Sequence, residues 1–157
     1  MMLEAYILSL NLDPQTNQFV VVLKEKKEGK KLLPIWIGPF EANAIAIALE
    51  KVSTPRPLTH DLIKNILDNL KIKVQKILIH SLKEGTFYAT IFLEDGDKVI
   101  EIDSRPSDAM ALALRTQSPI YVESQVFDEA GIIEEYASDE ELEKFLQNIN
   151  PEEFKKQ

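Results

Sequence analysis

The chain has 157 residues with a formal net charge of −8, and 45% of its residues are hydrophobic and 28% charged. This composition is typical of a folded domain of ordinary size and excludes a largely disordered chain. The acidic balance argues against a protein that coats DNA or RNA, because counterion release from phosphates needs a basic surface. It allows an enzyme that meets phosphates locally.

The chain contains no cysteine, which excludes disulfides, thiolate metal sites and a cysteine nucleophile. The N-terminal residues 1–10 lack a basic stretch before an apolar run, so they do not indicate a signal peptide. The longest nearly apolar stretch, residues 42–49, is too short to span a bilayer. We therefore expect a cytoplasmic protein with no membrane partner.

Three apolar or β-branched runs in the first part of the chain predict strands, at residues 3–10, 19–23 and 32–37. The polar, glycine-containing segment 24–31 predicts a hairpin with a long basic tip between the last two. Pro39 suits the first position of a helix, and Glu41 lies in the first turn, where a carboxylate complements the helix dipole. The alanine-rich residues that follow, to about Lys51, predict a buried helix.

A second helix is predicted after Thr59, because apolar residues recur there at helical spacing and form one stripe for burial: Leu62, Ile63, Ile66, Leu67 and Leu70. Three strands with short turns follow, at residues 74–82, 86–93 and 98–103. Strands joined by short turns pair as antiparallel neighbours. We further expect a helix opened by Arg105-Pro106-Ser107, a short strand at 120–123, and an acidic helix in the C-terminal tail 136–157.

An internal repeat organises these elements. Residues 35–50 align without a gap on residues 100–115, with identical residues at six of the sixteen positions. Chance similarity between two alanine-rich helices explains the helical half of the match, but not the preceding Ile-x-Ile strand and linker in phase. We therefore predict an α+β fold with a duplicated antiparallel hairpin–strand–helix unit, residues 19–51 and 87–116, in one domain of residues 1–135. The two helices should be buried on the sheet near a pseudo-twofold axis.

The two copies differ at the start of the helix, where the second copy is charged. The aligned pairs are Gly38 with Asp103, Phe40 with Arg105, and Asn43 with Asp108. A helix N-terminus favours anions, and Arg105 adds a bidentate phosphate donor beside Ser107. Asp103 and Asp108 are hard oxygen ligands for Mg²⁺ or Mn²⁺. The alternative is structural: Ser104 or Ser107 caps the helix, Asp108 complements its dipole, and Arg105 forms a fixed ion pair with either aspartate.

His60 and Asp61 form the second candidate, since a histidine can act as a general base near neutral pH. Both fall in the first turn of the predicted second helix, where Asp61 also has an ordinary role beside the helix dipole. The sequence contains no Gly-rich phosphate loop, nucleophile elbow or His-x-x-x-His pair. Residue patterns alone therefore reach a candidate anion or metal site and no further.

Several longer segments resemble the bifunctional nuclease domain family: Leu33–Ala44, Arg56–Leu62, Asp103–Ala113, Pro119–Val122 and Asp128–Ile132. The resemblance covers about residues 2–135 and implies a nuclease that acts on DNA and RNA with little sequence preference. Some relatives carry an appended helical module related to DNA-repair nucleases, and we expect a short member without it. The matched polar positions are Glu41, His60, Asp61, Asp103, Arg105, Ser107 and Asp108, which adds Glu41 as a weaker metal ligand.

The resulting hypothesis is a metal-assisted phosphodiester hydrolase. Asp103 and Asp108 would hold the divalent cation, Arg105 would clamp the scissile phosphate, and His60 or a metal-bound water would act as the base. The competing hypothesis is a non-catalytic module that binds a small anion or a protein partner. In both cases we expect a homo-oligomer, because small α+β domains with exposed hairpin edges often pair them.

Overall fold

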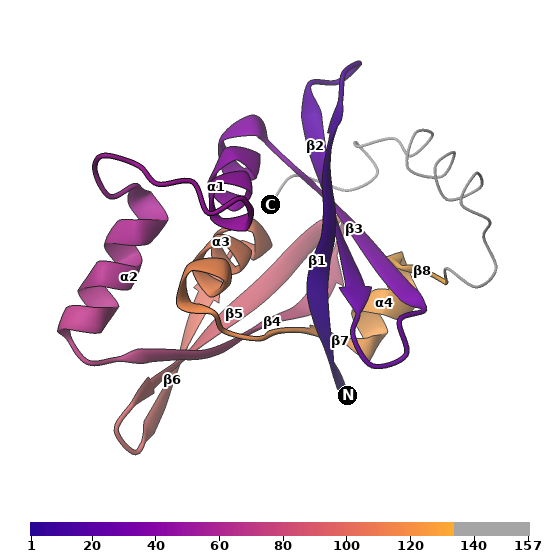
Figure 1. Ribbon diagram of the computed structural model, residues 1–157. Coiled ribbons are helices and arrows are strands. Elements are labelled where there is room, and N and C mark those ends of the chain that lie inside the picture. The colour runs from indigo at the N-terminus through magenta and orange to yellow at the C-terminus, as the bar shows by residue number, and fades with distance from the viewer. Residues whose placement is uncertain (134–157) are drawn as a thin grey trace.

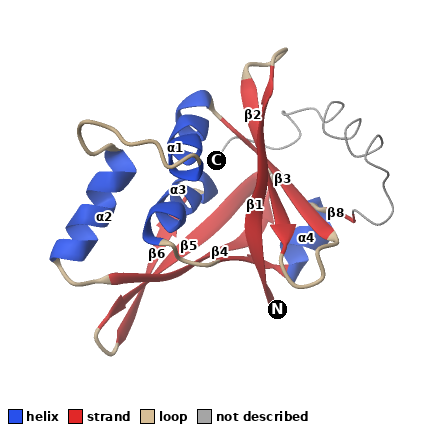
Figure 2. Cartoon of the chain, viewed as in Figure 1, coloured by secondary structure: helices blue, strands red, loops and turns tan. Residues whose placement is uncertain are grey.

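The computed structural model describes residues 1–133, which form an eight-stranded sheet with helices packed against it (Figures 1 and 2). The strands are β1 (Met2–Asp13), β2 (Gln18–Glu25), β3 (Lys31–Ile37), β4 (Lys73–Lys83), β5 (Thr86–Asp95), β6 (Lys98–Ser104), β7 (Ile120–Glu123) and β8 (Ile132–Ile133). The helices are α1 (Pro39–Leu49), α2 (Thr59–Asn69), α3 (Pro106–Thr116) and α4 (Ser124–Ala130). The predicted acidic helix in 136–157 lies outside the described residues.

Two antiparallel units, β1–β2–β3 and β4–β5–β6, meet at β7 in the middle of the sheet, whose order is β6-β5-β4-β7-β1-β2-β3-β8. β7 pairs antiparallel with β1 and parallel with β4, and so joins the two units into one sheet. The predicted hairpins are confirmed, with Val21 opposite Ile35 in one unit and Ile91 opposite Ile102 in the other. The predicted α+β class is therefore confirmed.

Side chains alternate between the two faces of each strand, and one face carries the main core. Val21, Ile35 and Ile77 are fully buried there, together with Ala109 and Met110 of α3. A smaller cluster uses the alternate positions of β2 and β3: Val20, Val22, Leu32 and Trp36. Of the helices that position the polar residues described below, α3 and α1 contribute buried residues to the main core. None of the helices in residues 1–133 is long and apolar enough to span a bilayer.

The three long helices are buried to different degrees. α3 is buried along most of its length, as predicted, because it packs on β4 and β5 and is covered by α1 and α2. α1 buries only Ala42 and Ile45, and it leaves Phe40 88% exposed. α2 buries none of its residues, so the predicted buried stripe is wrong: Leu62 stays 53% exposed because α2 packs mainly on α3 and stands away from the sheet (Figure 1).

The element boundaries also correct the register of the predicted repeat. β6 and α3 begin and end 67 residues after β3 and α1 do, whereas aligning residue 35 with residue 100 implies an offset of 65. In the structural register Pro39 matches Pro106, and Glu41 matches Asp108. Alanine recurs at every second position in both helices, so a slip of two residues leaves most of the helical match intact. The sequence alignment therefore paired the polar positions of the two segments two residues out of step with the element boundaries.

The structure also contains two elements that the sequence did not indicate, α4 and β8. α4 is a helix of 7 residues that packs on β4 and β3, and β8 pairs two residues with the edge of β3. Both elements are too short to produce a readable hydrophobic period. They lie away from the polar residues described next.

Candidate active site at the start of three helices

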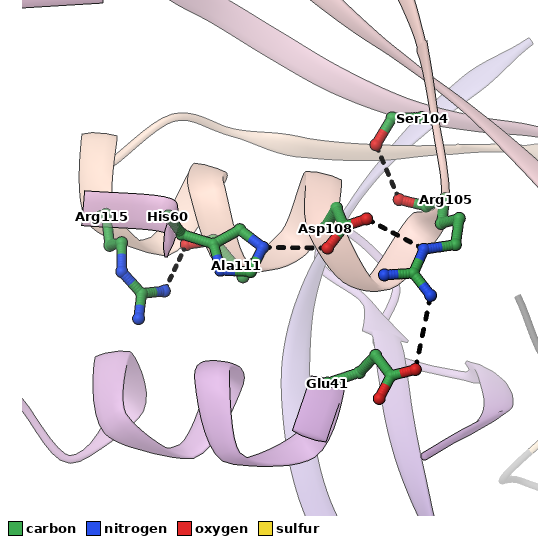
Figure 3. Close-up of polar contacts among 7 residues, drawn as sticks. All are labelled: Glu41, His60, Ser104, Arg105, Asp108, Ala111 and Arg115. Atoms are coloured by element: carbon green, nitrogen blue, oxygen red, sulfur yellow. Dashed lines mark hydrogen bonds and ion pairs between the residues drawn. The ribbon is translucent and has the colours of Figure 1, made fainter. Parts of the chain in front are cut away.

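The first turns of α1, α2 and α3 line a cavity of about 640 Å³. α1 and α3 each start with a proline, after Gly38 and Arg105 respectively, so their first turns are set in the same way. The polar side chains that meet here come from three separate segments: Glu41, His60, Arg105 and Asp108 (Figure 3). The structure thus brings His60 of the second sequence candidate next to Arg105 and Asp108 of the first.

Asp108 lies at the centre of this cluster, with one partner on each carboxylate oxygen. His60 Nε2 lies 2.9 Å from Asp108 Oδ1, and Arg105 Nε donates to Asp108 Oδ2 at 2.9 Å. The hydrogen bond from His60, with a smaller contribution from Arg105, lowers the pKa of Asp108 to about 2 although partial burial opposes this shift. The carboxylate is therefore ionised and can only accept, so Nε2 of His60 carries the hydrogen.

Arg105 joins the matched carboxylates of the two repeat units. Besides Asp108, its guanidinium donates to Glu41 Oε1 at 3.4 Å, a long contact at the limit of a hydrogen bond. The ion pair with Asp108 raises the pKa of Arg105 further above its ordinary value. In the structural register Gly38 matches Arg105, since each residue directly precedes the first proline of its helix. A Cβ at Gly38 would come within 2.9 Å of Glu41 Oε2. The absence of a side chain at Gly38 thus allows Glu41 to fold back toward Arg105.

Asp61 belongs to a separate ion pair that fastens α2 to α3. Its Oδ2 accepts the Leu58 backbone N–H at 2.9 Å, and its Oδ1 accepts from Arg115 Nε at 2.9 Å. The Leu58 N–H, then Arg115, lowers the pKa of Asp61. The Arg115 side chain is only 6% exposed and also donates to the Ala111 carbonyl, as Figure 3 shows. The geometry gives Asp61 a structural position next to His60, with no contact to Arg105 or Asp108.

Asp103 and Ser107 do not join the cluster in the way the sequence suggested. Asp103 lies in β6 opposite Thr90 with its side chain exposed, and it does not line the cavity. Ser107 is 2% exposed. Neither Ser104 nor Ser107 caps α3: the N-cap residue is Arg105, without a side-chain cap, and Ser104 Oγ donates to the Arg105 carbonyl. Of the structural alternatives, the ion pair between Arg105 and Asp108 is confirmed.

The carboxylates at the cavity do not form the divalent cation site expected from the sequence. The two carboxylates at the cavity, Glu41 and Asp108, both face the Arg105 guanidinium, and Asp103 lies apart from them. Among residues 1–133, no three acidic or histidine side chains converge as ligands for a metal ion. The described residues therefore do not form a ready ligand cage, and a cation would have to displace Arg105 from at least one carboxylate.

Sequence reasoning missed three residues that shape this region, Phe40, Asn43 and Arg115. Phe40 and Asn43 line the cavity beside Glu41, and Arg115 anchors Asp61. A signal for Arg115 was present, because Asp108 and Arg115 lie two helical turns apart and so share a face of α3. Phe40 gave no signal, since an apolar residue in an apolar helix predicts burial.

An ionised carboxylate that holds a histidine and an arginine beside a cavity defines a site that can move a proton and bind an anion. The sequence matches the bifunctional nuclease domain over residues 21–135, and the chain therefore belongs to the bifunctional nuclease domain family. This confirms the family resemblance found in the sequence.

The relatives fall into two groups. Two uncharacterized proteins of Mycobacterium tuberculosis, from strains CDC 1551 / Oshkosh and ATCC 25618 / H37Rv, are 39% identical over 164 residues, covering 97% of this chain and 98% of each relative. Bifunctional nuclease 1 of Oryza sativa subsp. indica is 25% identical over 126 residues, covering 78% of this chain and 38% of the plant protein. Bifunctional nuclease 2 of Arabidopsis thaliana is 28% identical over 115 residues, covering 71% of this chain and 35% of the plant protein.

Proposed function

We propose that the protein is a nuclease that hydrolyses phosphodiester bonds of DNA and RNA with little sequence specificity, and that the cavity between α1, α2 and α3 is its active site. The observation that carries this proposal is the Asp108 carboxylate, which holds a histidine on one oxygen and an arginine on the other. This geometry supports the proposal because a candidate proton acceptor, His60, and a candidate phosphate ligand, Arg105, share one carboxylate. The family and the names of the plant relatives support the same reaction class.

His60 is proposed as the general base. Because Nε2 donates to Asp108, the proton acceptor of the ring is Nδ1, which makes no hydrogen bond to any residue of the described range 1–133. A water molecule at the cavity would transfer one proton to Nδ1 as its oxygen bonds to the phosphorus atom. The P–O bond to the leaving sugar oxygen would break in the same step, and that oxygen would take up a proton from the solvent. Asp108 then stabilises the imidazolium that forms and keeps the ring oriented, as carboxylates paired with histidine do in other hydrolases.

Arg105 is proposed to bind the scissile phosphate and to stabilise the charge that develops on it. Its side chain is 46% exposed, and its contact to Glu41 is long at 3.4 Å, so a phosphate oxygen can replace that carboxylate while the bond to Asp108 stays in place. Contacts to phosphate carry no base information, which agrees with low sequence specificity. The net charge of −8 makes this local contact, and not long-range attraction, the source of binding.

Assistance by Mg²⁺ or Mn²⁺ is a separate proposal, because the described carboxylates face Arg105 and form no cage of three ligands. A cation could be shared between one of these carboxylates and the bound phosphate. Cleavage measured with either cation and with chelator tests this directly. Full activity in chelator would contradict a role for the metal. It would not affect the roles proposed for His60 and Arg105.

The test of the function uses the two histidines of the chain as a matched pair. Single-stranded DNA and RNA are incubated with size-exclusion fractions of the parent protein, His60→Gln and His80→Gln. His80 lies in β4, where its Nδ1 forms a hydrogen bond with Ser81 Oγ, and it does not line the cavity. We expect cleavage that co-elutes with the parent and His80→Gln peaks and is lost from the His60→Gln peak. Equal cleavage by the two variants, or cleavage away from the protein peak, would contradict the proposal.

The second candidate function is a non-catalytic oligomeric module that binds an anion or a protein partner. It is favoured by the exposed apolar side chains of α2 and of Leu70, the residue directly after it: Leu62 is 53% exposed, Ile66 49% and Leu70 62%. Such a row of apolar side chains on an amphipathic helix is typical of a surface that pairs with another protein. The homo-oligomer expected from the sequence would bury this row. A Leu62→Asp, Ile66→Asp protein that elutes at the same size as the parent would argue against pairing through α2.

A further inference from the structure

The cavity has a charged side and a neutral side, and the proposed reaction uses only the charged one. Glu41, His60, Arg105 and Asp108 form the charged side. The neutral side consists of Phe40, Asn43 and Ala44 of α1 and of Pro57 and Leu58 from the loop before α2. A cavity of about 640 Å³ with an apolar side and a few polar groups is of the size and kind that binds a small ligand.

Phe40 is the most unusual residue of the neutral side. It is 88% exposed, the most exposed aromatic residue among those the structure describes, although it sits at the start of a helix that faces the core. Exposure is not imposed by that position, because the matching residue of the second unit, Ser107, is 2% exposed. Leu58 beside it is 37% exposed. An apolar surface therefore borders the cavity next to the proposed phosphate clamp.

We propose that this neutral side is a subsite for an unpaired nucleobase, with Phe40 as the residue on which the base stacks. This inference deepens the proposed nuclease function and rests on it for the phosphate at Arg105. A nucleotide presents a phosphate beside a flat aromatic base, and the cavity offers a guanidinium beside a flat aromatic side chain. Aromatic rings bind bases of any identity because every base has a π-face. Asn43 is exposed and can donate to or accept from the edge of any base.

The subsite selects a class of substrate. In a duplex the bases are paired and stacked inside the helix, so a base can reach Phe40 only if it is unpaired. Single-stranded DNA and RNA supply such bases without the energy of unpairing. The preferred substrate is therefore single-stranded nucleic acid of either sugar type, with little dependence on sequence.

The experiment measures binding and cleavage separately. Fluorescence anisotropy is recorded with a labelled single-stranded oligonucleotide, with the same strand carrying one central abasic position, and with a blunt-ended duplex of two strands. A gel confirms that each probe stays intact. The proteins are the parent, Phe40→Ala, Phe40→Tyr and the control Leu12→Ala. Leu12 is 50% exposed in β1 and does not line the cavity. Cleavage rates on the single strand and on the duplex are measured with the same four proteins.

We expect Phe40→Ala to weaken binding of the single strand by about 5- to 150-fold, the range that follows from loss of one base–aromatic stack. Phe40→Tyr and Leu12→Ala should bind like the parent. The abasic strand should bind the parent more weakly than the intact strand, and Phe40→Ala should remove that difference. The ratio of single-strand to duplex cleavage should fall toward one in Phe40→Ala.

The two proposals can fail independently. Phe40-dependent binding without cleavage would support the base subsite and contradict the nuclease. Cleavage by the parent with unchanged binding and an unchanged single-strand to duplex ratio in Phe40→Ala would overturn the subsite and leave the nuclease in place. A change in the size-exclusion volume of Phe40→Ala with unchanged binding would show that Phe40 contacts a second copy of the chain, which would also overturn the subsite.

Discussion

Replacing Asp108 with asparagine keeps the shape of the side chain and removes the charge that His60 and Arg105 share. The pKa of Asp108 is about 2 in the folded protein and 3.8 in its ordinary state. That difference, at about 1.4 kcal/mol for each pKa unit, corresponds to about 2–3 kcal/mol of stability above pH 4. The side chain is 37% exposed, so solvent screens part of this energy. We expect a loss of about 1 kcal/mol, which lowers Tm by about 2–4 °C.

The pH dependence of this loss identifies its cause. Because the pKa of Asp108 is lowered on folding, its contribution is present above the unfolded pKa of 3.8 and is lost as pH falls toward 2. Urea unfolding of the parent and of Asp108→Asn should therefore show the full difference near pH 7 and a shrinking difference between pH 4 and about 2. A difference that stays constant over this range would show that the charge is not its source.

The same variant tests the mechanism. Without the carboxylate, the imidazolium of His60 loses its stabilising partner and Arg105 loses the bond that orients it. We expect kcat on single-stranded DNA to fall by about 10²- to 10⁴-fold, the range typical of impaired general base catalysis. An Asp108→Asn protein that is folded and cuts as fast as the parent would refute the role assigned to His60, Arg105 and Asp108 together.

Two further substitutions probe the surroundings of the site. Gly38→Ala places a Cβ within 2.9 Å of Glu41 Oε2, so we expect Glu41 to move away from Arg105. KM should then change, while Tm stays within about 2 °C of the parent. An unchanged KM would show that Glu41 does not affect phosphate binding by Arg105. Asp61→Asn leaves Arg115, whose side chain is 6% exposed, without its counter-charge. We expect a loss of about 2 kcal/mol in chemical unfolding, larger than for Asp108→Asn, and a smaller effect on kcat. The opposite order of stability losses would contradict the structural position given to Asp61.

Much of the fold was readable from the chain because it is encoded locally. Strands β1 to β7 and helices α1 to α3 follow from period-two and helical patterns, and the hairpins follow from short turns between strands. The exact register between the two aligned segments could not be predicted from the sequence. In the sequence the alternating alanines of the two helices match equally well two residues apart, and only the paired starts at Pro39 and Pro106 resolve the slip.

The candidate site was readable in part for the same reason. Arg105 and Asp108 are three residues apart at the start of one helix, so their ion pair could be anticipated. Asp103 was included because it is close in sequence, yet it belongs to a strand, and its side chain is exposed in β6 away from the cavity. Phe40 was expected to be buried because its helix is apolar, and the structure leaves it 88% exposed.

The sequence by itself determined which residues are polar at the start of each helix, which family the chain resembles, and that the fold belongs to the α+β class. Only the tertiary structure decided that His60 meets Asp108, 48 residues away, and that Glu41 faces the same arginine from the other unit. The physical reason is that periodicity and capping act within a few residues, whereas a contact between helices depends on how they pack. That packing is fixed by the whole buried core.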